Sequence, residues 1–127
     1  MANNKTAHPP RSHAAPRRSP CPVACSLDII GDRWTLLVIR DLVLGRTRFK
    51  DFIASPESIP TNILSERLAR LLRYKIVEQI PAHDGTKRFA YELTDKGKAL
   101  RPLLEALRDW GLEWEKGTRE LLGSRYI

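Results

Sequence analysis

Apolar residues recur every three or four positions along most of the chain, which predicts a mainly helical protein. The clearest example is the stretch 59–74, where four leucines fall on one side of a helix: Leu64, Leu68, Leu71 and Leu72. The other side is polar and carries Asn62, Glu66, Ala69, Arg70 and Arg73, with Ser65 at its margin. Pro60 suits an early helical position, and Thr61 and Asn62 are suited to capping the start.

Short amide and hydroxyl side chains near the start of this helix are followed by arginines further along. A helix needs this order when its first turns meet base edges and its later turns meet phosphates. An ordinary solvated amphipathic helix is the alternative interpretation.

Three shorter helices are predicted before this stretch. The first spans 23–30 and ends at Gly31, and the second spans 35–44, begins with Asp32 as its cap and ends at Gly45. The second helix is apolar on nearly every side, which is typical of a helix in the centre of a domain. Thr47 is expected to cap a third helix over 48–54, whose buried side is predicted to be Phe49, Phe52 and Ile53.

The segment 55–58 is a predicted turn, because Pro56 disfavours continuation of the third helix. A short helix, a tight turn and a longer helix with a polar face form the helix-turn-helix pattern.

Two strands are predicted after it, over 77–82 and 87–93, separated by the hairpin signal Asp84-Gly85. In the second strand Phe89, Tyr91 and Leu93 alternate with the remaining residues. The result is a hairpin with a basic, exposed tip, which is called a wing.

The C-terminal part begins with Thr94 as an N-cap and continues as a long helical region, in which Pro102 either introduces a kink or starts a second helix. A heptad-type seam follows, made of Leu100, Leu103, Leu107, Trp110 and Trp114, and it reaches Leu121 after a gap at Gly117. A small domain needs only part of this surface, so the seam predicts a partner helix, most economically from a second copy. The alternative is that the helix folds back on its own domain. A twofold pair would place two recognition helices about 34 Å apart, as a palindromic DNA site requires.

The chain of 127 residues has room for one modest domain and a tail, and its net charge of +7 favours a polyanionic partner, nucleic acid first and an anionic membrane surface second. Residues 1–20 contain four basic residues, several prolines and no acid, which predicts a disordered tail before a folded domain over 21–127. This tail either follows the DNA backbone or is a solubilising extension. No apolar run is long enough to cross a bilayer and no secretory signal is evident, so we expect a cytoplasmic protein.

Chemistry of other kinds has little support in the sequence. Cys21 and Cys25 are too few for a disulfide framework, and neither they nor the histidines have the spacing of zinc ligands. His8, His13 and His83 do not converge with a nucleophile, and no phosphate-binding glycine loop is present. We therefore expect no enzyme activity, no metal and no cofactor.

Three motifs occur in order: Cys21-Pro22-Val23, the run 27–34 (Leu-Asp-Ile-Ile-Gly-Asp-Arg-Trp) and the run 91–97 (Tyr-Glu-Leu-Thr-Asp-Lys-Gly). With them the chain resembles the HxlR family of bacterial transcription regulators, which are winged helix-turn-helix proteins related to the MarR group. The resemblance covers about residues 21–114. It implies an α+β fold, mainly helical with one small hairpin, and homodimers that bind operator DNA and contact each other through N- and C-terminal helices.

The resemblance also implies roles for single residues. In some members the cysteine that Cys21 matches senses oxidants or electrophiles, which leaves room for an oxidant or small-molecule signal. The chain departs from the family at 87–90, where a proline-containing segment is usual, and at Ser58, where a glycine is common.

Candidate DNA contacts follow from side-chain chemistry. Asn62 suits adenine, Arg70 suits guanine, and Glu66 either accepts from cytosine or orients Arg70. Arg73 lies late on the helix and is expected to contact phosphate. The other candidates are Thr61 and Ser65 on the helix, and Thr86, Lys87 and Arg88 at the wing tip.

Two further sets of candidates concern regulation and assembly. Cys21 is the better sensor candidate, because it lies near a helix start and close in sequence to Arg17 and Arg18, whereas Cys25 is more typical of an inert thiol at an interface. The predicted dimer interface contains Leu103, Leu107, Trp110 and Trp114. A winged-helix module that docks an acidic protein or RNA is the alternative function.

Overall fold

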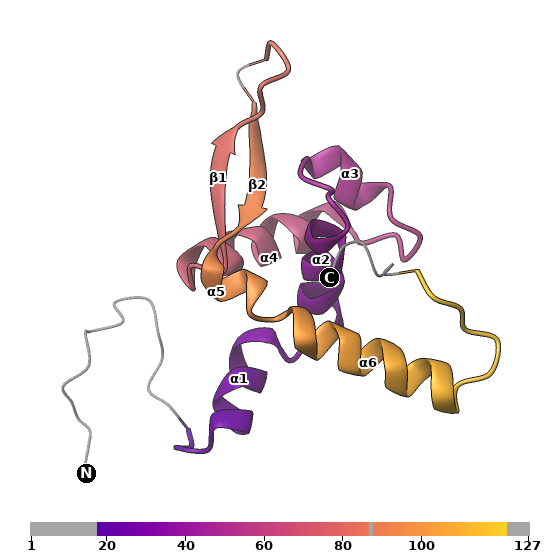
Figure 1. The fold of residues 1–127 in the computed structure, drawn as a ribbon. Helices are drawn as coiled ribbons and strands as arrows, with labels where there is room; N and C mark the ends of the chain where they lie inside the picture. The colour runs from indigo at the N-terminus through magenta and orange to yellow at the C-terminus, as the bar shows by residue number, and fades with distance from the viewer. Residues whose placement is uncertain (1–17, 87, 122–127) are drawn as a thin grey trace.

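A computed structural model of the protein describes residues 18–86 and 88–121 (Figure 1). It is mainly helical with one two-stranded antiparallel sheet, as the sequence predicts. The elements in chain order are α1 (Pro22–Ile30), α2 (Arg33–Val43), α3 (Phe49–Ile53), α4 (Thr61–Arg73), β1 (Val77–Pro81), β2 (Phe89–Leu93), α5 (Asp95–Lys98) and α6 (Arg101–Trp114).

Helix α2 lies at the centre of the molecule, where α3, α4, the hairpin and α6 surround it (Figure 1). Its residues Val38 and Ile39 are buried, and the buried leucines of α4 pack in the same core as Phe52 of α3. The apolar character that predicts a central position for α2 is therefore confirmed. Asp32 caps this helix as expected, accepting a hydrogen bond from the Thr35 backbone N–H at 3.0 Å.

The caps of α3 and α4 differ from the prediction. Arg48, not Thr47, is the N-cap of α3, and the Asp51 carboxylate accepts from the Arg48 backbone N–H at 3.0 Å. Pro60 is the N-cap of α4, which has no side-chain capping hydrogen bond, so Thr61 and Asn62 are the first helical residues rather than caps.

Two of the side chains predicted to be buried in α3 are placed differently. Phe52 is buried and Phe49 is half-buried, but Ile53 is exposed. Ile53 shares one side of the helix with Phe49 and Phe52, but it is the last residue of this five-residue helix and is exposed there.

The wing is the hairpin β1–β2, paired from Val77 opposite Leu93 to Pro81 opposite Phe89. The Tyr91 backbone N–H donates to the Thr47 carbonyl at 2.8 Å, which ties the second strand to the loop between α2 and α3. Phe89 is exposed whereas its neighbour Ala90 is buried, so the small residue faces the core at this position.

The C-terminal region consists of two helices, because α5 ends at Lys98 and α6 begins at Arg101 with Pro102 in its first turn. Of the two outcomes proposed for Pro102, a second helix is the one observed. Leu104 is the buried residue of α6. After Trp114 the chain turns at Gly117 (φ 90°), and the segment 118–121 returns toward α6.

Parts of the chain lie outside the described residues, namely 1–17, Lys87 and 122–127. They include most of the predicted tail, with Arg17, and the wing-tip candidate Lys87. Within the described residues, none of the helices has the length and apolar character that crossing a membrane requires. The same residues contain no group of three or more His, Cys, Asp or Glu side chains arranged to hold a metal ion.

Candidate nucleic-acid interface

The outward side of α4 is polar and exposed, while its leucine side is buried. Leu64, Leu68 and Leu71 are at most 2% exposed. The exposed residues of the opposite side are Thr61, Asn62, Ser65, Glu66, Ala69 and Arg73. Almost all the sequence-predicted contacts on this helix therefore share one accessible surface. Figure 1 shows α4 beneath the hairpin and near α3, the arrangement of a winged helix-turn-helix.

Arg67 anchors α4 to the start of α2. Its Nε donates to Asp32 Oδ1 at 3.0 Å, and the same carboxylate accepts from Thr35 Oγ1 at 2.7 Å. Partial burial of Asp32 opposes ionisation, but the hydrogen bonds from Thr35 and Arg67 outweigh it and lower the pKa of Asp32 to about 2. The capping residue of one helix thus also fixes the orientation of the next.

Arg70 points toward α1 and α2. One of its guanidinium nitrogens donates to the Asp28 carbonyl, and the other lies 3.6 Å from Asp32 Oδ2. Glu66 accepts from Arg67, so the expected orientation of Arg70 by Glu66 is wrong. Base reading by Arg70 stays a prediction, and it requires this side chain to leave its present partners.

A buried polar cluster joins α2 to the turn before α4. The Arg40 guanidinium donates two hydrogen bonds to the Glu57 carboxylate, both at 2.8 Å, and two to Asp41 Oδ1, at 2.9 and 3.2 Å. Asp41 is almost fully buried and also accepts from Arg46 at 3.1 Å and from Ser55. The hydrogen bonds from Arg40 lower the pKa of Glu57. In turn, the hydrogen bonds to Glu57 and Asp41 raise the pKa of Arg40.

The sequence alone does not predict this cluster. The one local feature of the sequence that points to it is Asp41, an acidic residue within an apolar helix. A buried carboxylate needs hydrogen-bond or ion-pair partners, so its presence predicts such partners nearby. Because the cluster spans α2, the α2–α3 loop and the turn at Glu57, it holds the helix-turn-helix in one geometry.

The tip of the wing carries polar side chains and lies next to Arg48, the N-cap of α3. Thr86 is exposed, and its backbone N–H and Oγ1 donate to Asp84 Oδ1 at 3.0 and 2.6 Å. These bonds, together with the ion pair to Arg48, hold the pKa of Asp84 well below its usual range. Arg88 is exposed, and Arg48 and Arg88 both line a hollow between α3 and the wing. Lys50 lines it as well, and neither Arg48 nor Lys50 was among the predicted contacts.

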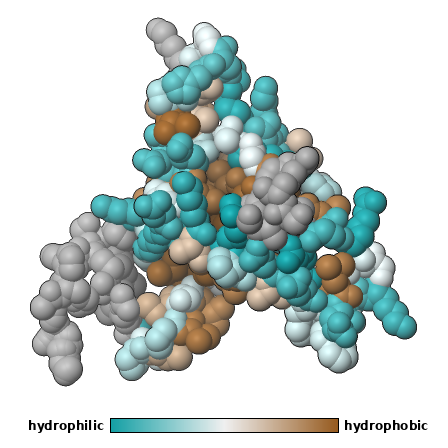
Figure 2. All heavy atoms as spheres, in the orientation of Figure 1, coloured by the Kyte–Doolittle hydropathy of each residue, from teal (hydrophilic) through white to brown (hydrophobic). Residues whose placement is uncertain are grey.

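A second exposed surface is apolar and lies on α6 and α1. The predicted seam residues Leu103, Leu107, Trp110 and Trp114 are all exposed, with Trp110 at 60% and Trp114 at 66%. On α1, Val23 and Leu27 are exposed as well. Figure 2 shows apolar surface gathered over α1, at the lower left of the view.

Cys21 and Cys25 are both free thiols on α1. Cys21 is the exposed N-cap, and Cys25 lies half-buried one turn later, with its backbone N–H donating to the Cys21 carbonyl at 2.9 Å. Arg18 was expected to favour the Cys21 thiolate, but its guanidinium pairs with Asp28 instead. Exposure and a place at the helix start therefore remain the features that favour reactivity of Cys21.

Comparison with known proteins agrees with this architecture. The profile of the HxlR-like helix-turn-helix family matches residues 29–119. The HTH-type transcriptional regulator YvaP of Bacillus subtilis, itself uncharacterised, is 36% identical over 89 residues, which are 70% of this chain and 82% of YvaP.

Solved structures extend the likeness to the whole fold. The structure of PA1607 superposes with a TM-score of 0.73 at 40% identity, covering 82% of this chain and 73% of PA1607. The redox regulator HypR in its reduced form superposes with a TM-score of 0.68 at 28% identity, covering 76% of this chain and 95% of HypR. The chain belongs to the HxlR-like helix-turn-helix family of DNA-binding transcriptional regulators.

Proposed function

We propose that the protein is a sequence-specific regulator that binds a pseudo-palindromic DNA site as a homodimer. In this proposal α4 enters the major groove, and the wing contacts the adjacent groove or the backbone. The observation that carries the proposal is the exposed polar side of α4, opposite a side on which Leu64, Leu68 and Leu71 are buried. The net charge of +7 supplies the attraction to phosphate.

The chemistry of α4 supports a division of roles along the helix. Asn62 lies in the first turn and is suited to adenine, and Thr61, Ser65 and Glu66 lie beside it on the same surface. Arg73 lies in the last turn and is suited to a phosphate. Thr86 and Arg88 extend the contact along the wing, and Lys87 is the third candidate there.

The apolar surface of α6 and α1 supports the homodimer. A surface that exposes two tryptophans together with Leu103 and Leu107 is unfavourable in water, and burial against a second copy removes it. Both helices lie on the side of the molecule away from the wing (Figure 1). A twofold pair joined there leaves both copies of α4 free for one DNA duplex.

Selection of duplexes from a random pool tests this proposal. We expect the selected sequences to contain an inverted repeat with half-sites about one helical turn apart. Fluorescence anisotropy on the selected duplex and on a scrambled duplex then gives the specificity ratio, and a salt titration gives the number of phosphate contacts. Equal affinity for both duplexes would contradict sequence-specific recognition. A preference for RNA or for an acidic protein would favour the alternative function, a winged-helix module that docks such a partner.

We further propose that oxidation of Cys21 weakens DNA binding. The thiol is exposed at the start of α1, next to the apolar surface that the second copy covers, so oxidation there changes the dimer contact. Peroxide treatment followed by mass spectrometry and anisotropy tests this, with Cys21→Ser expected to abolish the response and Cys25→Ser expected to retain it. An unmodified Cys21 together with unchanged affinity would contradict the proposal.

A further inference from the structure

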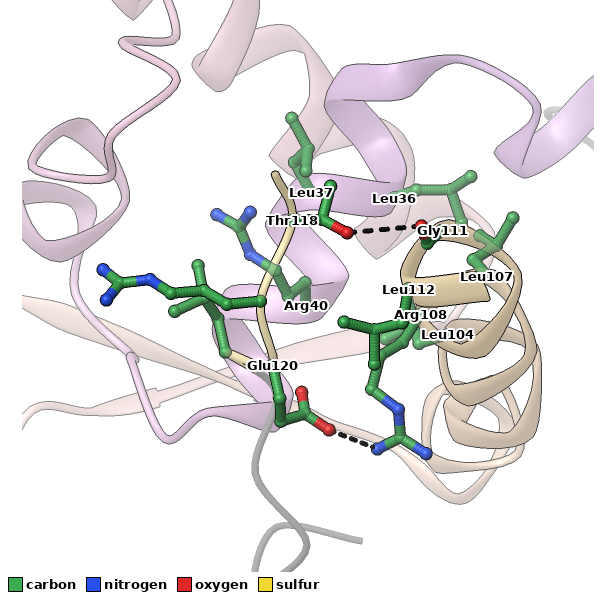
Figure 3. Close-up of a pocket in the computed structure, with 12 residues that line it drawn as sticks. Leu36, Leu37, Arg40, Leu104, Leu107, Arg108, Gly111, Leu112, Thr118 and Glu120 are labelled. Carbon is green, nitrogen blue, oxygen red and sulfur yellow. Dashed lines mark hydrogen bonds and ion pairs between the residues drawn. The ribbon is translucent and has the colours of Figure 1, made fainter. Parts of the chain in front are cut away.

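A pocket of about 450 Å³ lies between α2, α6 and the segment 118–121 (Figure 3). Leucines form its walls, with Leu36 and Leu37 from α2 and Leu104, Leu107 and Leu112 from α6. The volume is within the range of about 300–1,000 Å³ that is typical of small-molecule sites. We call this cavity the α2–α6 pocket.

The segment 118–121 closes one side of the pocket and is held by specific polar contacts. Thr118 Oγ1 donates to the Gly111 carbonyl at 3.2 Å and to the Glu115 carbonyl at 2.8 Å. Glu120 pairs with Arg108 at 3.1 Å across the mouth (Figure 3). The segment 118–121 therefore forms a wall of the pocket, which is more than a gap between two helices.

The charged groups that line the pocket are three arginines and one glutamate. Arg40 is balanced by Asp41 and Glu57, and Arg108 is paired with Asp109 and Glu120. Arg119 makes no ion pair with any of the described residues. The pocket thus combines an aliphatic interior with one uncompensated positive charge at its rim.

We propose that the α2–α6 pocket binds a small amphipathic anion, with an aliphatic chain against the leucines and a carboxylate at Arg119. The occupant is chosen by charge and shape. An uncharged apolar molecule would give Arg119 no charged partner, and a small inorganic anion would leave the leucine walls exposed to water.

The position of the pocket connects it to both surfaces of the protein. Leu107 belongs to the pocket wall and to the proposed dimer interface. Arg40 belongs to the wall and to the cluster that fixes the turn before α4 through Glu57. A ligand that moves α6 relative to α2 therefore alters the spacing of the two copies of α4. This regulatory consequence rests on the proposed function, whereas the ligand site does not.

Calorimetric titration of the purified full-length chain with decanoate tests the site directly. We expect saturable binding of one decanoate per chain, with 1-decanol binding at least about tenfold more weakly because it lacks the charge that Arg119 recognises. Arg119→Ala is expected to weaken decanoate binding about threefold to tenfold. The matched control is Lys116→Ala, which removes an exposed cation outside the pocket and should leave the affinity unchanged.

Leu112→Trp provides a second test, because the larger side chain fills the pocket from a partly exposed position that the core does not require. We expect it to abolish decanoate binding while circular dichroism and the sedimentation coefficient stay those of the wild type. The proposal is overturned if decanoate does not saturate, if 1-decanol binds equally well, or if Arg119→Ala binds as tightly as the wild type. It is also overturned if Leu112→Trp converts a dimer to a monomer. That result would show that the second copy of the chain, rather than a small molecule, occupies the pocket of the wild type.

Anisotropy on the selected duplex separates this site from the proposed function. Decanoate is expected to change the affinity of the wild type for DNA and to have no effect on Leu112→Trp. Saturable decanoate binding by a chain that binds no DNA would refute the proposed function and leave the ligand site established. Binding of both with no mutual effect would refute the regulatory consequence alone.

Discussion

Helices α4 and α6 share one construction and differ in what they present to solvent. Each buries one side against the core around α2, through Leu64, Leu68 and Leu71 in α4 and through Leu104 in α6. The outer side of α4 carries amide, hydroxyl and charged groups, whereas the outer side of α6 carries leucines and tryptophans. The core contacts explain why both helices form, and only the exposed sides distinguish the proposed nucleic-acid surface from the proposed dimer interface.

The largest expected effect comes from reversing the chemistry of the outer side of α6. Trp110→Glu together with Trp114→Glu should make the chain monomeric and lower its affinity for the selected duplex by at least about 100-fold, because interface tryptophans commonly contribute about 2 kcal/mol or more each. Sedimentation equilibrium and anisotropy measure the two quantities.

The control for this experiment is Glu113→Gln, which changes an exposed position of α6 outside the seam. It should remain dimeric and bind DNA as the wild type does. A double glutamate variant that stays dimeric would show that α6 is not the dimer interface. The outer sides of α4 and α6 could then no longer be assigned to DNA and to the second copy.

The next effect concerns the outer side of α4. Asn62→Ala should lower affinity for the selected duplex by about 1–3 kcal/mol and change affinity for random DNA little, because a base-edge contact is lost. Arg73→Ala should weaken both duplexes alike and reduce the salt dependence by about one contact per chain. Anisotropy at several salt concentrations separates the two patterns, and an equal loss on both duplexes for Asn62→Ala would assign it to the backbone.

Most of this fold could be predicted from local patterns, because helix periodicity, the Asp84-Gly85 turn and the Asp32 cap act over a few residues. The sequence also placed Asn62, Ser65 and Arg73 on one exposed surface. It did not predict that Arg70 turns toward Asp28 and Asp32, because those partners lie about 40 residues earlier and meet it only through packing.

The same limit explains the cluster around Asp41. Arg40 and Glu57 are 17 residues apart and belong to different elements, so no periodic pattern relates them. The short helix α3 is a further example. The spacing of Phe49, Phe52 and Ile53 predicts one buried side, but it does not predict that Ile53, the last residue of the helix, is exposed.

A smaller effect is expected from the anchor that fixes α4. Arg67→Ala should lower the free energy of unfolding by about 1–2 kcal/mol, because a hydrogen-bonded ion pair with Asp32 is lost. The pKa of Asp32 is about 2 in the folded protein and 3.8 ordinarily. A lowered carboxyl pKa stabilises the fold above the ordinary value, and this stabilisation is lost as the pH falls from about 4 through about 2.

The difference in stability between the wild type and Arg67→Ala should therefore shrink over that range of pH. Urea unfolding followed by tryptophan fluorescence at about pH 5 and about pH 2.5 measures it. Lys50→Ala is the control, since it removes an exposed cation from α3. A difference that is independent of pH would show that Arg67 acts through packing rather than through the Asp32 carboxylate.

The smallest expected effect lies at the entrance to α4, where Ser58 has φ 59°. This left-handed conformation is unfavourable for an L-residue by about 1–2 kcal/mol and is free of that strain in glycine. The structure thus gives a physical reason for the glycine that is common at this position in the family. Ser58→Gly should raise the free energy of unfolding by about 0.5–1 kcal/mol, because relief of strain is partly offset by the greater flexibility of the unfolded chain. Ser65→Gly, within α4, should instead lower stability by a similar amount, so a gain at Ser65 or a loss at Ser58 in urea unfolding would contradict the strain at the turn.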